Sequence, residues 1–140
     1  MSHSCIENYL HIIFSTKNRQ PFIVPEIEAR LHSYIVGISK MQKVPVLKIN
    51  GMEDHIHILL KLHPSVALAT LIKEFKVYST AWMKRSGYPG FAWQEGYGGF
   101  SYSKSMLDSV IHYIENQKRH HRQISFKDEI ELLKKKWGVE

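Results

Sequence analysis

Hydrophobic and polar positions along this chain follow two periods, one typical of strands and one typical of helices. Tyr9–Ser15 is rich in β-forming residues and has three apolar side chains on one face, which predicts a first strand. Val44–Asn50 predicts a second strand, and the stretch Glu53–Leu60 predicts a third. Because only a short turn separates these two, they should form an antiparallel hairpin. A fourth strand is predicted near Gly99.

Apolar residues recur at helical spacing in the segments between these strands. A first helix begins at Pro25, since proline is tolerated in the first helical turn. A second helix follows Ser65, which suits an N-cap, and the Gly87–Gly90 turn breaks it. Two helices are therefore expected between the strands.

Further helices are predicted after the fourth strand. One begins at Ser105, with Asp108 completing a capping box, and runs to Arg122. Phe126–Trp137 predicts another amphipathic helix.

The order of these elements is strand, helix, strand, strand, helix, strand and then extra helices. This order predicts an α+β fold, a ferredoxin-like split βαβ antiparallel sheet with extra C-terminal helices. Residues 1–140 suit a single domain with one core. The first two helices should cover one face of the sheet and leave the other face available.

Composition narrows the class of protein. A content of 44% hydrophobic and 23% charged residues is ordinary for a globular domain. The net charge of +6 favours a polyanionic partner, nucleic acid before membrane. The single cysteine, Cys5, permits no internal disulfide and no cysteine-rich zinc site. No signal pattern and no membrane-spanning apolar run is evident, so a cytoplasmic protein is expected.

Candidate chemistry first arises on the predicted third strand. Side chains alternate along a strand, so Ile56 and Ile58 point to one face while His55 and His57 point together to the other. Two imidazoles placed in this way form a cation site, or they are polar side chains on a sheet face.

A second candidate lies on the helix that begins at Ser105. At about 100° per residue, Tyr113 and Gln117 stand one turn apart, on a row that flanks the apolar stripe. The helix can therefore pack by its stripe and still direct a phenol and an amide toward a neighbouring polar site. His112 points to the opposite side and is not expected to be a ligand.

An H-x-H on a strand followed by Y-x-x-x-Q on a late helix resembles the single-tyrosine HUH transposases of small bacterial insertion sequences, the IS200-like family, and their repeat-associated relatives. Phe14–Pro21 resembles the opening strand and basic turn of that family. Two ranges resemble the segment that precedes the catalytic helix in that family, namely Trp93–Tyr97 and Ser101–Ser103. Tyr113–Gln117 together with His120-His121 resembles the catalytic helix itself. The resemblance covers most of the chain.

The resemblance implies a metal-dependent transposase that cleaves and rejoins single-stranded DNA. Tyr113 would attack a DNA phosphorus and form a 5′-phosphotyrosine, which a 3′-hydroxyl later reverses without ATP. His55, His57 and Gln117 would hold Mg²⁺ or Mn²⁺, and imidazole ligands favour Mn²⁺. Asp54 departs from the small polar residue that the family commonly places there; it could accept a hydrogen bond from an imidazole N–H, or it could be only a turn residue. No residue is assigned as general base.

The implied partner is single-stranded DNA beside a hairpin, with no membrane, and the implied assembly is a homodimer, although repeat-associated relatives can act as monomers. Aromatic side chains between residues 91 and 103 could stack on unpaired bases or pack against the sheet. The basic residues expected to contact DNA are Lys17, Arg19, Lys73, Lys76, Lys118, Arg119 and Arg122.

Two other classes of protein compete with this interpretation. One is a ferredoxin-like module that binds single-stranded nucleic acid without catalysis, but no RNP1-like pattern lies on a central strand. The other is a zinc hydrolase, for which a third histidine or a carboxylate at motif spacing is missing. DNA nicking separates them, because a binding module would not cleave and a hydrolase would leave no covalent adduct.

Overall fold

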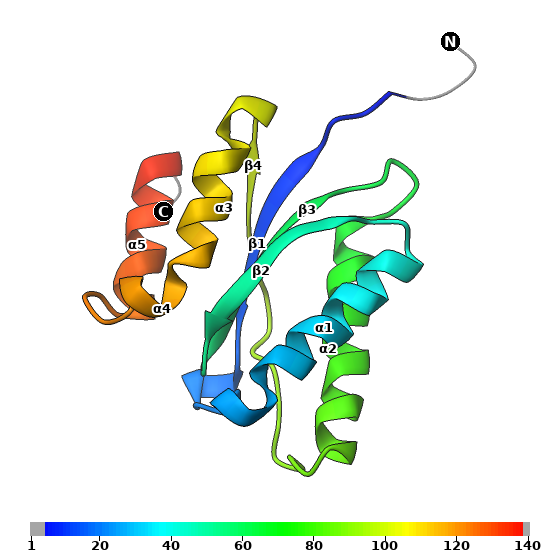
Figure 1. Ribbon diagram of the computed structural model, residues 1–140, viewed down its shortest axis with the longest axis vertical. Coiled ribbons are helices and arrows are strands. Elements are labelled where there is room, and N and C mark those ends of the chain that lie inside the picture. Colours follow the sequence, from blue (N-terminus) through cyan, green and yellow to red (C-terminus); the bar gives the residue numbers. More distant parts are fainter. Residues whose placement is uncertain (1–4, 139–140) are drawn as a thin grey trace.

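The alternating segments form a four-stranded antiparallel sheet in the computed structural model, which describes residues 5–138 (Figure 1). The strands are β1 (Tyr9–Ser15), β2 (Val46–Met52), β3 (His55–Lys61) and β4 (Gly98–Tyr102). Their spatial order is β2-β3-β1-β4, so the strand that carries the two histidines is central. The second strand begins later than predicted, because Pro45 has no N–H for the ladder.

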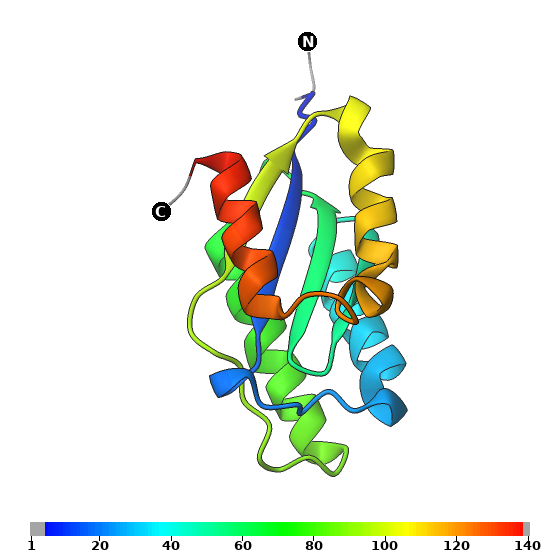
Figure 2. The ribbon, with the colours of Figure 1, turned by 90° about the vertical axis from the view of Figure 1, so that its left-hand side faces the viewer.

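Helices lie on both faces of this sheet (Figure 2). The helices are α1 (Pro25–Met41), α2 (Leu68–Arg85), α3 (Leu107–Glu115), α4 (Gln117–His120) and α5 (Phe126–Trp137), with 3-10 turns η1 (Lys17–Arg19) and η2 (Lys104–Met106). The predicted α+β class with a ferredoxin-like order is confirmed. Among residues 5–138, no helix combines the length and hydrophobicity that a membrane crossing requires.

The prediction that one sheet face stays available is wrong. Figure 2 shows α3 and α5 in front of the sheet, while α1 and α2 lie behind it. Ile56 and Ile58 are fully buried in the cluster that packs on α1 and α2, whereas Leu59 on the opposite face packs on Val110 of α3. The apolar stripes of α3 and α5 need an apolar partner, and they pack against this face of the sheet.

Two predicted helix starts are also wrong, because each serine bonds within its own loop. The amide and hydroxyl of Ser65 lie 3.1 and 2.6 Å from Nδ1 of His63, and α2 begins after this turn without a side-chain cap. Ser105 lies in η2, where its hydroxyl pairs with that of Ser103 at 2.8 Å, and Asp108 completes no capping box. Short polar side chains often prefer such local bonds to a cap.

Gly51 lies where the β2–β3 hairpin is tightest. A Cβ on this residue would stand 2.1 Å from the backbone oxygen of His55. Gly51→Ala should therefore lower the free energy of unfolding by about 1–3 kcal/mol, measured by urea titration. The matched control is Gly37→Ala in α1, where nothing lies within 4 Å of the added atom and the helix should gain roughly 0.5–1 kcal/mol. Similar effects of the two substitutions would contradict this account.

Candidate metal centre and nucleophile

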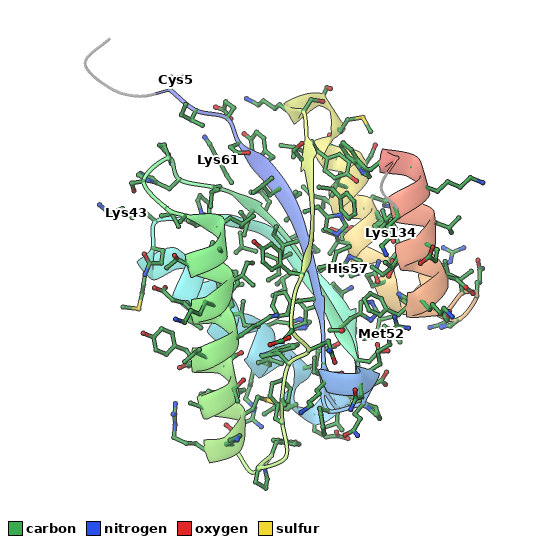
Figure 3. The ribbon with its side chains drawn as sticks, turned by 180° about the vertical axis from the view of Figure 1, so that it is seen from behind. Cys5, Lys43, Met52, His57, Lys61 and Lys134 are labelled. Atoms are coloured by element: carbon green, nitrogen blue, oxygen red, sulfur yellow. The ribbon has the colours of Figure 1, made fainter. Side chains whose placement is uncertain are left out.

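The two histidines of β3 are both fully buried and contact side chains of the C-terminal helices, in the layer between these helices and the sheet. Figure 3 shows His57 on the side of the sheet that these helices cover. The ring centroids of His55 and His57 are 5.1 Å apart. Nδ1 of His55 lies 2.7 Å from Oδ1 of Asp54, the hydrogen bond that the sequence suggested. A carboxylate on one nitrogen fixes the ring and turns the other nitrogen, Nε2, toward the site.

The predicted helix from Ser105 to Arg122 is interrupted at Asn116, which has φ −93° and ψ 17°. Nδ2 of Asn50 on β2 donates to the last two carbonyls of α3, at 3.0 and 3.1 Å, and so satisfies the end of that helix. Gln117 begins α4 and is fully buried, whereas Tyr113 on the last turn of α3 is partly buried. The break therefore directs the amide and the phenol into the same layer as the two histidines.

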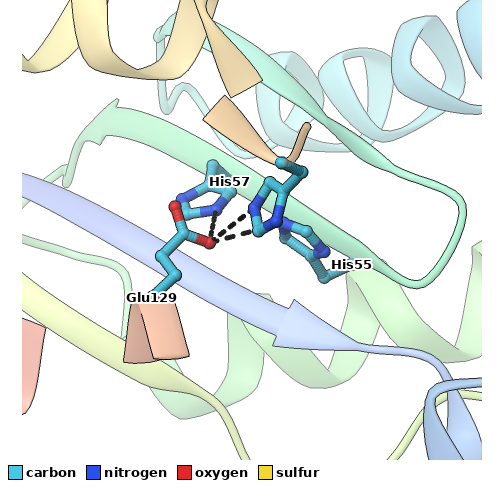
Figure 4. Close-up of side chains that lie close together, drawn as sticks. His55, His57 and Glu129 are labelled. Atoms are coloured by element: carbon cyan, nitrogen blue, oxygen red, sulfur yellow. Dashed lines mark hydrogen bonds and ion pairs between the residues drawn. The ribbon is translucent and has the colours of Figure 1, made fainter. Parts of the chain in front are cut away.

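Glu129 of α5, which the sequence analysis did not assign, lies at the centre of this layer (Figure 4). The side chain is only 1% exposed. Its Oε1 is 3.2 Å from Nε2 of His57, 2.9 Å from Nε2 of His121 and 3.5 Å from Nε2 of His55. One carboxylate oxygen thus faces three imidazoles.

The other oxygen of Glu129, Oε2, faces the pair that the helical spacing predicted. It accepts a hydrogen bond from Nε2 of Gln117 at 2.9 Å and another from the hydroxyl of Tyr113. The phenol and the amide are therefore joined to the histidines through a single buried carboxylate.

The donor set fits a divalent cation. When Nδ1–H of His55 donates to Asp54 and Nε2 carries no proton, the lone pair on Nε2 faces Oε1 of Gln117, 3.2 Å away. Two acceptors facing each other need a cation or a proton between them. Ligand atoms of four residues lie within 4.8 Å of one another, namely His55, His57, His121 and Glu129. Imidazole nitrogens with a carboxylate and an amide oxygen suit Mn²⁺ better than Mg²⁺.

Buried charges shift the ionisation of the cluster. Burial alone would raise the pKa of Glu129, but hydrogen bonds from His121 and His57 outweigh burial and hold that pKa far below its usual value. Burial lowers the pKa of His57 to about 4, so this imidazole is neutral and can supply a lone pair. Burial, and then the hydrogen bond to Glu129, raises the pKa of Tyr113 well above its usual value, so the phenol keeps its proton here.

His121 behaves differently from the histidines of β3. Its Nδ1 faces the carbonyl of Ile124 at 3.1 Å and its Nε2 faces Glu129, so both nitrogens meet acceptors. Burial would lower the pKa of His121, but the hydrogen bond to Glu129 outweighs it and the pKa is raised. An imidazolium here places a positive charge beside the carboxylate.

The sequence contained one signal for Glu129. Phe126, Glu129, Ile130 and Leu133 follow helical spacing, and three of these four are buried. An acidic residue inside an apolar row is a sign of a buried polar site. His121 carried a weaker signal, as part of the His120-His121 pair.

The basic residues predicted to contact DNA have different environments. Nζ of Lys118 donates to Glu28 at 2.8 Å and to the carbonyl of Gly51 at 2.7 Å, and Nζ of Lys76 donates to two carbonyls of the loop before β4. Both ammonium groups therefore already have partners within the chain. Lys76 is partly buried, and the other six are exposed, namely Lys17, Arg19, Lys73, Lys118, Arg119 and Arg122.

Arg19 lies beside the candidate site. Its guanidinium is 5.2 Å from the ring centroid of Phe126, and this ring stacks on His55 with centroids 4.0 Å apart. Asn18 and Arg19 both have positive φ, 55° and 54°, which gives the basic turn an uncommon backbone. On the far side of the sheet, Lys73 lines a groove of about 790 Å³ between α2 and the loop before β4.

Comparison of the sequence with known families gives one clear match. The model of the family described as "Transposase IS200 like" matches residues 4–117. The chain is also 26% identical over 114 residues to the ISDra2 transposase TnpA of Deinococcus radiodurans, which covers 76% of this chain and 81% of that protein. The family match includes the H-x-H, Tyr113 and Gln117, whereas His121, Glu129 and all of α5 lie beyond it.

Solved structures share the fold. A crystal structure of a candidate transposase of Deinococcus radiodurans has a TM-score of 0.66 and 23% identity, over 82% of this chain and 95% of the other. A REP-associated tyrosine transposase bound to a REP hairpin has a TM-score of 0.67 and 14% identity, over 87% of this chain and 73% of the other. At these identities the likeness concerns the fold.

Proposed function

Because this chain belongs to the IS200-like transposase family, we propose that it cleaves and rejoins single-stranded DNA through a covalent bond to Tyr113. One observation carries the proposal. The Tyr113 hydroxyl, the Gln117 amide and His57 all bond to the buried carboxylate of Glu129. Cleavage of a phosphodiester without hydrolysis requires a protein nucleophile, and a cation site next to that nucleophile supports it.

In the proposed reaction, the oxygen of Tyr113 attacks the scissile phosphorus while its proton, which is hydrogen-bonded to Glu129 in the resting site, is released to solvent. The bond from phosphorus to the 3′-oxygen breaks, and that oxygen takes up a proton from solvent. The 5′-phosphate remains on the tyrosine. In the reverse step a 3′-hydroxyl attacks this phosphotyrosine and releases its proton to solvent. A phosphodiester is restored, the bond from phosphorus to Tyr113 breaks and the phenol oxygen takes up a proton, so no ATP is consumed.

We propose that His55, His57 and Gln117, together with His121 and Glu129, hold Mn²⁺ or Mg²⁺. Such an ion supplies Lewis-acid stabilisation of charge on the scissile phosphate when bound. The two oxygens of Glu129 face different groups, so Oε1 can serve the ion while Oε2 accepts the hydrogen bond that orients the Tyr113 hydroxyl. His121 can join the ligands only after it loses its Nε2 proton.

The proposed substrate is single-stranded DNA beside a hairpin, held by the exposed basic residues. The slope of log affinity on log salt should be about −0.7 for each phosphate contact, measured by fluorescence anisotropy between low and physiological salt. Arg19→Ala should weaken binding and make the slope shallower by about 0.7. The control is Lys40→Ala, in the last turn of α1, which should change neither the affinity nor the slope. A flat slope, or equal affinity for blunt duplex, would count against the proposal.

The homodimer that the sequence suggested stays a prediction, with sedimentation as its first measurement. If the tyrosine serves the partner's site, a mixture of Tyr113→Phe and His57→Ala subunits should regain cleavage, because half of the mixed sites have both residues. If each chain completes its own site, the mixture should stay inactive. The hydrogen bond from Tyr113 to Glu129 within one chain supports the second arrangement.

A further inference from the structure

His11 is a buried histidine that the proposed reaction leaves without a role. It lies on β1 beside β3, is 1% exposed, and stacks on His57 with ring centroids 5.0 Å apart. Its Nε2 lies 2.7 Å from Nδ1 of His57. A ring this deeply buried, with no acidic group among residues 5–138 bonded to it, is neutral, because an unpaired buried charge is costly. A second buried imidazole is a costly packing residue, and the contact with His57 suggests a reason for it.

The two nitrogens of His57 face different partners. Nε2 faces Glu129 and the proposed ion site, and Nδ1 faces His11. A neutral imidazole carries its proton on one nitrogen only, and a nitrogen that binds an ion must offer a lone pair. If Nε2 of His57 is the ligand, its proton is on Nδ1, and this buried N–H needs an acceptor. Within residues 5–138, Nε2 of His11 is the acceptor in reach.

We propose that His11 is a positioning residue for the cation site. Its Nε2 accepts a hydrogen bond from Nδ1–H of His57 and thereby keeps Nε2 of His57 free to act as a ligand. Metal ligands commonly depend on a hydrogen bond of this kind to the second ring nitrogen. The inference rests on the cation-binding half of the proposed function and is independent of the chemistry at Tyr113.

When no ion is bound, the hydrogen bond between His57 and His11 has its donor and acceptor exchanged. The carboxylate of Glu129 can only accept, so Nε2–H of His57 donates to it and Nδ1 of His57 accepts from Nε2–H of His11. When His57 becomes a ligand, both rings change tautomer together and the net charge of the pair stays the same. His11 then carries its proton on Nδ1.

The surroundings of His11 allow this second tautomer. Nδ1 of His11 has no hydrogen-bond partner within residues 5–138. The residue lines a cleft of about 230 Å³ between α3 and α5, which also reaches Tyr102 and Tyr113. A cleft of this volume has room for water molecules, and a water can accept the hydrogen bond that Nδ1–H of His11 would donate.

Two substitutions distinguish a role of His11 as a hydrogen-bond acceptor from a role as a packing side chain. His11→Phe keeps an aromatic ring against His57 but removes the acceptor, whereas His11→Gln replaces the ring and keeps an acceptor oxygen. The Mn²⁺ dissociation constant of each variant, measured by electron paramagnetic resonance, should rise about 10–100-fold for His11→Phe. For His11→Gln it should stay within a few-fold of the wild type.

Nuclear magnetic resonance of ¹⁵N-labelled histidine provides a second measurement on the wild-type protein. The proton of His57 should be on Nε2 in metal-free protein and on Nδ1 at saturating Mg²⁺. A proton that stays on Nε2 of His57 overturns the inference even if His11→Phe does not fold.

The other outcomes are also decisive. Equal Mn²⁺ affinity in folded His11→Phe and wild type overturns the inference and leaves the cation site standing. An equal loss of Mn²⁺ affinity in His11→Phe and His11→Gln assigns His11 a packing role and also overturns the inference. Wild type that binds no Mn²⁺ overturns both the cation site and this inference, while adduct formation by Tyr113 is measured separately.

Discussion

Tyr113→Phe is expected to abolish the covalent protein–DNA adduct, with a loss of cleavage of at least about 10³-fold. The substitution removes one oxygen and keeps the ring, so folding and DNA binding should survive. Wild type incubated with Mn²⁺ and labelled single-stranded DNA should give a slow-migrating band on denaturing electrophoresis. The variant should give none, and mass spectrometry should place the nucleotide on the peptide that contains Tyr113.

Tyr102→Phe is the matched control for this experiment. Tyr102 lines the same cleft as Tyr113, but Tyr113 is the tyrosine that donates to Glu129. The control variant should therefore form the adduct at a rate close to that of wild type. An adduct that persists in Tyr113→Phe, or that maps to Tyr97 or Tyr102, would overturn the assignment of the nucleophile.

His55→Ala and His57→Ala should each abolish cleavage and remove the stabilisation that Mn²⁺ gives to the folded protein. An ion that binds only the folded state raises the unfolding temperature, and the shift grows with the logarithm of the ion concentration divided by its dissociation constant. Wild type should therefore unfold at a higher temperature with Mn²⁺, and neither variant should respond. Differential scanning fluorimetry measures the shift, and circular dichroism without metal checks the fold.

His112→Ala provides the control, because His112 is exposed on α3, on the side that faces away from the site as the helical spacing predicted. It should keep both the Mn²⁺ response and the cleavage. Full activity in both the His55 and His57 variants would refute the metal-site proposal.

Local periodicity was sufficient to predict the elements of the fold. The bounds of β1 and α5 match the prediction, and α1 begins at Pro25 as expected. The helix starts at Ser65 and Ser105 were wrong because a hydroxyl has several partners in reach, and the choice among them depends on the loop. The separation of α3 from α4 depends on Asn50 of β2, a contact that a pattern within one helix cannot predict.

The candidate site was predicted only in part. A period of two placed His55 and His57 on one face, and a period of 3.6 placed Tyr113 beside Gln117, and the structure brings all four together. Glu129 was missed because its place depends on how α5 packs across the sheet, 72 residues from His57 in sequence. Packing of distant segments, and not any local pattern, assembles this carboxylate with its partners.

Helix α5 is held to the sheet by three buried side chains, Phe126, Glu129 and Leu133. One of these three is the carboxylate of the site, and it is the shared partner of Tyr113, Gln117 and two imidazoles. Glu129→Leu would leave these buried polar groups without their acceptor, so it would loosen α5 as well as remove the acceptor of Tyr113. The docking of the last helix and the chemistry of the site therefore depend on the same side chain, and selection for stability and selection for activity both act to keep a carboxylate at position 129.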